Sequence, residues 1–382
     1  MNSKREARAM PKMSGCRLVL LLTVLVACSA SSGFCAEGGS RQLVSPRLLK
    51  HAGLEISWEN ELPIKKDEHL AKLFLLGERI YAISDRNYVI ASDIENGNIV
   101  FSRSLGPEGI PLDRLTLYGD ELVVVLGSTL IEANAQSGTE RKTTQMKFGI
   151  ACPAGRNSSF LYLGGVDRRL HVLQAKDRVQ VFEAAAENNS AITSIIAGED
   201  FIIFATDAGN VISIVPDRPI RLWQFDAGDA VVGSLVRDGG SIFFASKDTN
   251  VYRVDIDGPT RRRLAWKYQM PAALEAGPQV TAQVVYQYAR GKGLTAIDKE
   301  KGSTIWMLPE GIELLSEAEG KAYVITKDRT LAIMDNVEAK KIYSVNFAQV
   351  SRYAANAADA KIYIGNESGR IACLEPANRG SR

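Results

Sequence analysis

Histidine, paired cysteines and long apolar segments are all scarce in this sequence, and each shortage narrows what the chain can do. Only 3 of the 382 residues are histidine, and no two of the 5 cysteines are adjacent or spaced as C-x-x-C. The sequence therefore supports neither a zinc site nor a disulfide framework. The apolar run at 18–27 is too short to cross a bilayer of about 30 Å as a helix.

The beginning of the chain has the pattern of a secretory signal, a basic stretch followed by an apolar run. Residues 1–27 contain five basic residues and one acid. Residues 25–28 read Leu-Val-Ala-Cys, which resembles the lipobox of bacterial lipoproteins. We expect either acylation of Cys28 or ordinary cleavage after Ala30. Residues 1–27 are thus predicted to be a signal peptide and 28–52 a linker, with the protein exported to the periplasm or the outer membrane.

Charge is close to balanced once the leader is set aside. Removing residues 1–27, with five basic groups and one acid, changes the formal net charge from +2 to −2. Nucleic-acid binding needs a basic footprint for phosphates, so we expect no nucleic-acid partner. Arg261, Arg262 and Arg263 form the one compact basic run. We interpret this run as a solvated loop between two strands.

Short apolar β-type segments recur at intervals of about 40 residues, a period typical of repeat architectures. Polar turn residues follow each segment, as in 207–210, and a second strand follows the turn. These are hairpin signals, because Gly and Asn supply the positive φ that tight turns need. The pattern predicts an all-β fold with eight repeats, whose apolar segments are 80–83, 122–125, 160–163, 201–204, 242–245, 284–286, 322–325 and 362–364.

The second half of the repeat carries the most specific motif. Residues 296–306 read A-x-D-x-x-x-G-x-x-x-W, and 91–101 repeat this with Phe101 at the aromatic position. The motif resembles the tryptophan-docking repeat of pyrroloquinoline-quinone (PQQ) propellers, and the resemblance covers about 53–376. It implies an eight-bladed β-propeller of four-stranded antiparallel blades, followed by a tail at 377–382. The expected blade-closing aromatics are Trp58, Phe101, Phe182, Trp223, Trp266, Trp306 and Tyr343.

The eighth repeat is incomplete at the C-terminus. Its motif begins at Ala372, and the aromatic position would fall on Arg382, the last residue. Residues 54–58 have the pattern of an outer strand, so we expect the N-terminal strand to complete the last blade and close the ring. Blades two to five depart from the motif. Lys142 replaces an aromatic, Trp223 comes about two residues early and Trp266 about four residues late, which leaves a seven-bladed ring open.

Few residues offer catalytic chemistry. Enzymes with PQQ propellers, as the resemblance implies, use calcium, a carboxylate base, a stacking tryptophan and often adjacent cysteines. This chain lacks the cysteine pair, and its tryptophans are used by the blade-closing position. We interpret His171 as a structural strand residue and Cys152 and Cys373 as buried apolar residues. Recurring aspartates are expected to fix equivalent turns rather than bind metal: Asp93, Asp207, Asp248, Asp298 and Asp328.

These observations predict a non-catalytic, cofactor-free binding propeller of the cell envelope, monomeric and touching a membrane only through a lipid anchor. The lipoprotein propeller of the outer-membrane β-barrel assembly machinery is similar in size and plan, which implies envelope proteins as partners. Fold alone does not fix function. Two alternatives stay open: a PQQ-dependent or other small-molecule-binding enzyme or sensor that uses the axial funnel, and a docking module of a larger complex.

Overall fold

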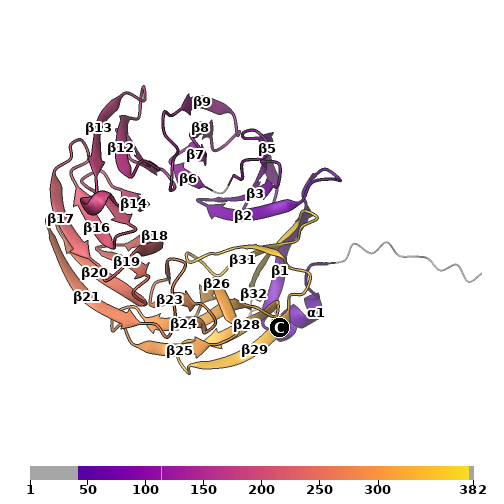
Figure 1. Cartoon of the computed structure of the whole chain (residues 1–382). Helices are drawn as coiled ribbons and strands as arrows, with labels where there is room; N and C mark the ends of the chain where they lie inside the picture. The colour runs from indigo at the N-terminus through magenta and orange to yellow at the C-terminus, as the bar shows by residue number, and fades with distance from the viewer. Residues whose placement is uncertain (1–41, 113, 378–382) are drawn as a thin grey trace, which may run out of the picture. The chain divides into compact units, whose positions relative to one another are not determined.

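The computed structural model describes residues 42–112 and 114–377, which form eight four-stranded antiparallel sheets arranged as a ring (Figure 1). Each sheet is one blade, and in seven blades the four strands follow one another in sequence from the centre of the ring outward. First strands of neighbouring blades contact each other, as β14 does β18. The predicted eight-bladed β-propeller is thereby confirmed, and the seven-bladed alternative is wrong.

The strand bounds of the first four blades are as follows. Blade 1 holds β2 (Leu70–Leu76), β3 (Arg79–Ser84), β4 (Tyr88–Asp93) and β5 (Ile99–Ser104). Blade 2 holds β6 (Leu115–Tyr118), β7 (Glu121–Leu126), β8 (Thr129–Asn134) and β9 (Glu140–Gln145). Blade 3 holds β10 (Gly155–Arg156), β11 (Phe160–Gly164), β12 (Arg169–Gln174) and β13 (Gln180–Ala185). Blade 4 holds β14 (Ile192–Ala197), β15 (Ile202–Thr206), β16 (Asn210–Ile214) and β17 (Arg221–Asp226), after the 3-10 turn η1 (Glu187–Asn189).

The remaining blades follow the same order. Blade 5 holds β18 (Val231–Asp238), β19 (Ser241–Ser246), β20 (Asn250–Asp257) and β21 (Arg261–Gln269). Blade 6 holds β22 (Gln279–Val280), β23 (Val284–Ala289), β24 (Gly293–Asp298) and β25 (Thr304–Leu308). Blade 7 holds β26 (Gly311–Ala318), β27 (Lys321–Thr326), β28 (Thr330–Asp335) and β29 (Lys340–Asn346). Blade 8 holds β30 (Arg352–Ala354), β31 (Ile362–Gly365), β32 (Arg370–Pro376) and β1 (Leu54–Glu61).

Ring closure uses the two ends of the described chain. Strand β1 pairs with β32 in antiparallel register, with Trp58 opposite Cys373 and Glu59 opposite Ala372. The N-terminal strand therefore supplies the outer strand of the last blade, as the motif predicted. Closure of this kind removes a long unpaired edge from the sheet that holds the chain ends.

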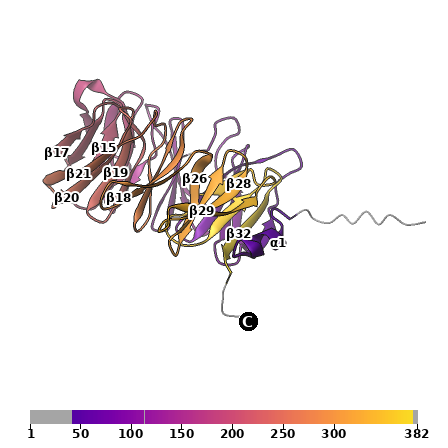
Figure 2. The ribbon, with the colours of Figure 1, turned by 90° about the horizontal axis from the view of Figure 1, so that it is seen from below.

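Part of the segment that we expected to be a linker is folded. Residues 46–51 form the short helix α1 (Pro46–His51), which contacts β1 and β29 (Figures 1 and 2). Leu43 and Leu49 are buried in the core between blades 7 and 8. The linker prediction is thus wrong for residues 42–52, since their apolar side chains cover that core. None of the described helices is long and apolar enough to span a membrane.

The hydrophobic core is divided among the boundaries between blades. Eight buried clusters join each blade to the next, as Tyr286 and Trp306 of blade 6 pack with Leu314 and Met334 of blade 7. Burial of apolar area stabilises by about 25 cal/mol per Å², so each boundary contributes directly to ring stability. We do not expect single blades to fold alone, because each cluster combines residues of two neighbouring blades.

Two faces of the ring follow from the antiparallel order of the strands. The first and third turns of each blade emerge on one face, which we call the front face. The second turns and the connections between blades emerge on the opposite, back face.

Candidate functional site

The seven aromatics that the motif singled out occupy one register position. Each lies on an outer strand opposite the same position of the third strand, and a bulge falls directly before it. The separation from Ser213 to Trp223 equals that from Ala91 to Phe101. Trp223 is therefore not early, and the prediction of a shifted position there was wrong. Trp266 is displaced by three residues, because the hairpin formed by β20 and β21 is longer than that of the other blades.

The tryptophans dock on the third turn of the following blade. Trp58 Nε1 donates to the backbone oxygen of Ile94 at 2.9 Å, and Trp266 Nε1 to that of Lys299 at 2.9 Å. A glycine of the same turn lies against each ring, since a Cβ on Gly97 would come within 2.5 Å of Trp58. Gly302 has the same relation to Trp266. The motif glycine and aromatic thus form one contact between neighbouring blades, with a structural role.

The other aromatics vary in how completely they are enclosed. Phe101 and Trp223 are buried, Phe182 is half-buried, and Tyr343 is 37% exposed. The exposure of Tyr343 matches its place beside the chain ends, where blade 8 has no third turn to cover it. The blade-closing role therefore does not extend fully to Tyr343.

A buried ion pair stands at the boundary where the aromatic is missing. Lys142 occupies the aromatic position of blade 2, and Arg178 occupies the glycine position of blade 3 with a φ of 70°. Arg178 Nε donates to Glu132 Oε2 at 2.7 Å, and both side chains are more than nine-tenths buried. Glu132 lies opposite Lys142 in the sheet. An ion pair thus joins blades 2 and 3 where aromatic docking joins other blades.

The residues considered for chemistry have structural environments. His171 is buried, stacks on Phe148 with ring centroids 3.7 Å apart, and has Nε2 2.9 Å from Asp167. Cys152, in the connection between β9 and β10, and Cys373 of β32 are free thiols and are buried as expected. Burial raises the pKa of Cys152 to about 11 and that of Cys373 to about 12. Within residues 42–112 and 114–377, no group of three or more His, Cys, Asp or Glu side chains could hold a metal ion.

The recurring aspartates hold turns, but in two classes rather than one. Asp93 and Asp298 accept hydrogen bonds from backbone N–H groups within their own third turns. Asp207 and Asp248 lie in second turns and accept from the backbone at the entry to the same blade, Asp207 from Ala191. Asp328 also lies in a second turn. The two classes emerge on opposite faces, so our prediction of equivalent turns was wrong.

An exposed, charged hairpin of blade 5 lies on the front face. Strands β20 and β21 continue for three residue pairs beyond the position where the pairing of blade 1 ends, and their last pair is Asp257 opposite Arg261. Arg261, Arg262 and Arg263 lie in strand β21 and are exposed. The prediction that these arginines form a loop was therefore wrong. The prediction that they are exposed to solvent is confirmed. We call residues 255–263 the blade 5 hairpin.

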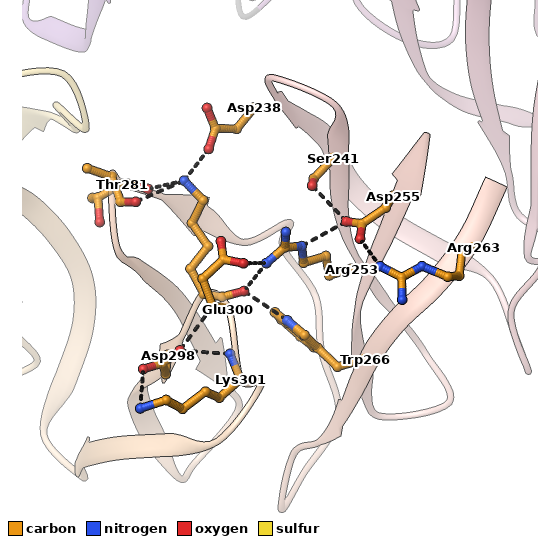
Figure 3. A network of polar contacts seen from close by, with 12 residues as sticks. Asp238, Ser241, Arg253, Asp255, Arg263, Trp266, Thr281, Asp298, Glu300 and Lys301 are labelled. Carbon is orange, nitrogen blue, oxygen red and sulfur yellow. Dashed lines mark hydrogen bonds and ion pairs between the residues drawn. The ribbon is translucent and has the colours of Figure 1, made fainter. Parts of the chain in front are cut away.

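A polar network fixes the base of this hairpin to blade 6 (Figure 3). Arg253 donates to Asp255 at 2.9 Å and to the backbone oxygen of Lys299 at 2.8 Å, and pairs with Glu300 at 2.7 Å. Lys299 Nζ lies against Asp238 and donates to the backbone oxygen of Thr281 at 3.1 Å. The contacts span two blades, so the hairpin projects from a rigid base.

The arginines of the hairpin are available to a partner. Arg261 pairs with Asp257 and Arg263 with Asp255, each at 2.8 Å, and both arginine side chains are more than three-quarters exposed. Exposed pairs of this kind contribute only about 0–1 kcal/mol, so a partner carboxylate can replace the aspartate. Guanidinium groups bind carboxylates through two parallel hydrogen bonds. The blade 5 hairpin is our candidate site for an acidic protein surface.

The sequence held one signal for this hairpin. The separation from Arg253 to Trp266 is three residues longer than the ten from Ala296 to Trp306. The motif alone predicts a late aromatic from this difference, whereas the structure shows an extended hairpin. A longer hairpin at constant register would have placed the three arginines in a strand.

Comparisons with known proteins agree with the fold. A family model described as outer membrane protein assembly factor BamB matches residues 55–264 and 248–381. No curated protein sequence matches the chain. BamB from Moraxella catarrhalis is a similar solved structure, with a TM-score of 0.65, 13% identity, and coverage of 86% of this chain and 99% of that one.

Two further solved structures share the fold. The computationally designed Ika8 protein has a TM-score of 0.65 and 12% identity, with coverage of 84% of this chain and 99% of its own. The β-propeller domain of Cps50 (Swd1) from Myceliophteria thermophila has a TM-score of 0.56 and 12% identity, covering 83% and 99%. These identities establish the fold alone. The family model covers nearly the whole propeller, and the chain therefore belongs to the family described as outer membrane protein assembly factor BamB.

Proposed function

We propose that this chain is an exported, non-catalytic scaffold of the cell envelope that binds other envelope proteins during outer-membrane protein assembly. The observation that carries the proposal is the family match, which includes all eight blades in its two segments, 55–264 and 248–381. The description of that family names outer-membrane protein assembly. A scaffold needs a rigid body with fixed recognition elements, and the ring offers both.

The physical support comes from the blade 5 hairpin. Its base is held by contacts across two blades, so the backbone that carries its arginines needs little ordering on binding. Guanidinium groups recognise carboxylates with defined geometry, which favours an acidic protein partner over a neutral one. Electrostatic complementarity of this kind mainly sets specificity and association rate.

Capture from envelope extracts tests the scaffold role. The full chain, carrying an affinity tag at its C-terminus, is crosslinked in cells and purified from solubilised envelopes, and captured proteins are identified by mass spectrometry. We expect components that insert or deliver outer-membrane β-barrels. Recovery of only cytoplasmic or unrelated proteins would overturn the proposal.

A matched pair of variants tests the hairpin within the same experiment. Arg261→Ser removes an exposed arginine paired with Asp257 from the blade 5 hairpin. Arg218→Ser removes an exposed arginine paired with Asp217 from the third turn of blade 4. We expect the first variant to reduce capture and the second to leave it unchanged. Equal capture by both would place the partner elsewhere on the ring.

Export and anchoring are part of the proposal. Residues 1–41 lie outside the described residues, so support comes from the basic and apolar pattern of 1–27 and from the lipobox-like residues 25–28. Metabolic labelling with a fatty acid compares the wild-type chain with Cys28→Ser. We expect label only in the wild-type chain, and equal labelling of both would refute acylation at Cys28.

The absence of catalysis is also proposed and is tested directly. Purified protein is mixed with PQQ, calcium and an electron-accepting dye, with alcohols and sugars as substrates. We expect no dye reduction above that of the protein-free mixture. Clear turnover would favour the alternative function, a quinoprotein-like enzyme.

A further inference from the structure

A hollow opens on the front face between the first turns of three consecutive blades. It has a volume of about 310 Å³ and is bounded by residues 281–283 of blade 6, 317–320 of blade 7 and 357–358 of blade 8. Ligand sites in proteins begin at about 300 Å³, so one long side chain fits with room to spare. None of the residues that line the hollow belongs to the blade 5 hairpin, although Thr281 also takes part in the polar network at the base of that hairpin.

One carboxylate in this hollow is held in a fixed position. Glu317 Oε2 accepts a hydrogen bond from Thr281 Oγ1 at 2.6 Å and another from the Tyr286 hydroxyl at 2.8 Å. The Tyr286 hydroxyl in turn accepts from Asn336 Nδ2 at 2.7 Å, and Asn336 Oδ1 accepts from Trp306 Nε1 at 2.7 Å. A polar chain thus runs from the buried docking tryptophan to the carboxylate. Such preorganisation lowers the cost of binding a cation.

The wall of the hollow is made largely of small side chains. Ala282, Ala318, Ala357 and Ala358 line it, and the lining residues include no lysine, arginine or histidine. Methyl groups of this kind suit the apolar stem of a long cationic side chain, which buries its methylenes and directs its charge to a polar group. Glu319, exposed at the rim, adds a second negative charge.

The chain itself supplies an example of an ammonium group bound beside this turn. Lys299 Nζ donates to the backbone oxygens of Thr281 and Ala282, at 3.1 and 3.0 Å, and is paired with Asp238 of blade 5 (Figure 3). The first turn of blade 6 thus already binds one ammonium group together with a carboxylate from a neighbouring blade. The same turn meets Glu317 at the hollow.

We propose that the hollow binds the side chain of a lysine in a partner protein, with its ammonium group at Glu317 and its methylenes against the alanines. The inference rests on the proposed function in one respect, because the lysine that it invokes belongs to a protein partner. It adds a second recognition element, of opposite charge to the blade 5 hairpin. The front face would then bind an acidic feature of its partner at the blade 5 hairpin and a basic one at the hollow.

Methyl spectroscopy tests the site on the full chain. The protein is labelled with carbon-13 at alanine methyls and titrated with acetyl-Gly-Gly-Lys-Gly-Gly-amide, or with the same peptide carrying Nε-acetyllysine. We expect saturable shifts at the four lining alanines with lysine and about tenfold weaker binding with acetyllysine, the loss of a charge-assisted hydrogen bond. An arginine peptide shows whether the site selects ammonium over guanidinium.

Two variants and a matched control complete the test. Glu317→Gln keeps an oxygen that accepts from Thr281 and Tyr286 but removes the charge, so we expect about tenfold weaker binding at unchanged melting temperature. Ala318→Leu fills the hollow and should abolish the shifts even if Glu317→Gln does not fold. Glu78→Gln removes an exposed carboxylate from the first turn of blade 1 and should bind normally.

Several outcomes would overturn the site. These are equal shifts from the lysine and acetyllysine peptides, unchanged binding by both hollow variants, or no shift at about 10 mM peptide, where millimolar affinities register. Capture of envelope proteins with no lysine binding would remove the site and leave the scaffold function intact. Lysine binding without capture of envelope proteins would support the site and contradict the scaffold function.

Discussion

The guanidinium group of Arg178 and the carboxylate of Glu132 form an ion pair across the boundary between blades 2 and 3, and both are almost fully buried. Arg178 also has a φ of 70°, which is costly for any residue with a Cβ. Burial lowers the pKa of the Arg178 guanidinium. This boundary thus combines a buried charge pair with backbone strain. At the boundary between blades 1 and 2, Phe101 packs against Gly138 in the equivalent positions.

The first prediction concerns the loss of one partner of this pair. Glu132→Ala leaves the guanidinium of Arg178 buried without a counter-charge, so we expect the free energy of unfolding to fall by about 3–5 kcal/mol. Urea denaturation followed by circular dichroism measures this. Glu338→Ala, which breaks an exposed pair with Lys340, should change it by no more than about 0.5 kcal/mol and serves as the control. Similar losses for the two variants would contradict burial of the pair.

A second prediction rebuilds the docking contact. Glu132→Ala, Lys142→Trp and Arg178→Gly together recreate the arrangement of Ala91, Phe101 and Gly138 at the neighbouring boundary. The triple variant should recover most of the stability lost in Glu132→Ala, because it restores buried aromatic area and relieves the positive φ. A loss equal to the sum of the three single changes would show that the boundary cannot accept an aromatic.

The third prediction compares two tryptophans with different hydrogen bonds. Trp306 Nε1 donates to Asn336, whereas Trp223 Nε1 is buried and has no acceptor among the described residues. Trp306→Phe should therefore destabilise the fold by about 1–3 kcal/mol more than Trp223→Phe, because only the first leaves a buried acceptor unpaired. Thermal and urea unfolding of both variants give the comparison. An equal effect would mean that the indole hydrogen bonds add nothing.

A fourth prediction separates steric contact from backbone strain at glycine. Gly302 and Gly258 both have a positive φ near 70°, but a Cβ on Gly302 would lie 2.6 Å from the Trp266 ring and one on Gly258 meets no atom within 4 Å. Gly258→Ala should cost about 1 kcal/mol from strain alone. Gly302→Ala should cost about 2–4 kcal/mol, since it also displaces the docked ring. Equal costs would argue that the turn moves freely away from Trp266.

The fifth prediction follows from the two buried thiols. Their pKa values, about 11 for Cys152 and about 12 for Cys373, leave far less thiolate at pH 8 than an ordinary cysteine has. Alkylation by iodoacetamide should be at least about a hundredfold slower in the folded chain than in urea, because the thiolate is the reacting form. Peptide mapping by mass spectrometry resolves each site. Burial raises the pKa of both thiols in the folded state. Their contribution to the free energy of unfolding is therefore full below about pH 9 and is lost above it, as the thiols of the unfolded chain ionise.

Much of the fold could be predicted because each repeat contains the residues that stabilise its own turns and its contact with the next blade. The aspartate that holds a third turn, the glycine at positive φ and the aromatic that docks beside it recur at fixed spacing, as in Asp298, Gly302 and Trp306. The incomplete eighth repeat and the strand-like residues 54–58 together indicated how the ring closes. Each of these signals lies within one repeat or at the two ends.

The features that escaped prediction depend on contacts between repeats. Arg178 and Glu132 are 46 residues apart, and each one alone looks like a departure from the motif. Glu317 and Thr281 likewise come from different blades, so the hollow has no local sequence signal. Helix α1 folds because Leu49 covers a boundary that is completed only by blades 7 and 8. Such pairings become visible only once the blades are placed side by side.

The pairing of β1 with β32 has a consequence for how the protein is made. Strand β1 is synthesised before every strand of blades 1 to 7 and its partner β32 after all of them, so β1 waits unpaired until β32 has been made. Contacts so distant in sequence form slowly, and an open strand edge invites wrong partners in the meantime. The ring can therefore close only after β32 has been made and has met β1, which places completion of blade 8 late in the formation of the propeller.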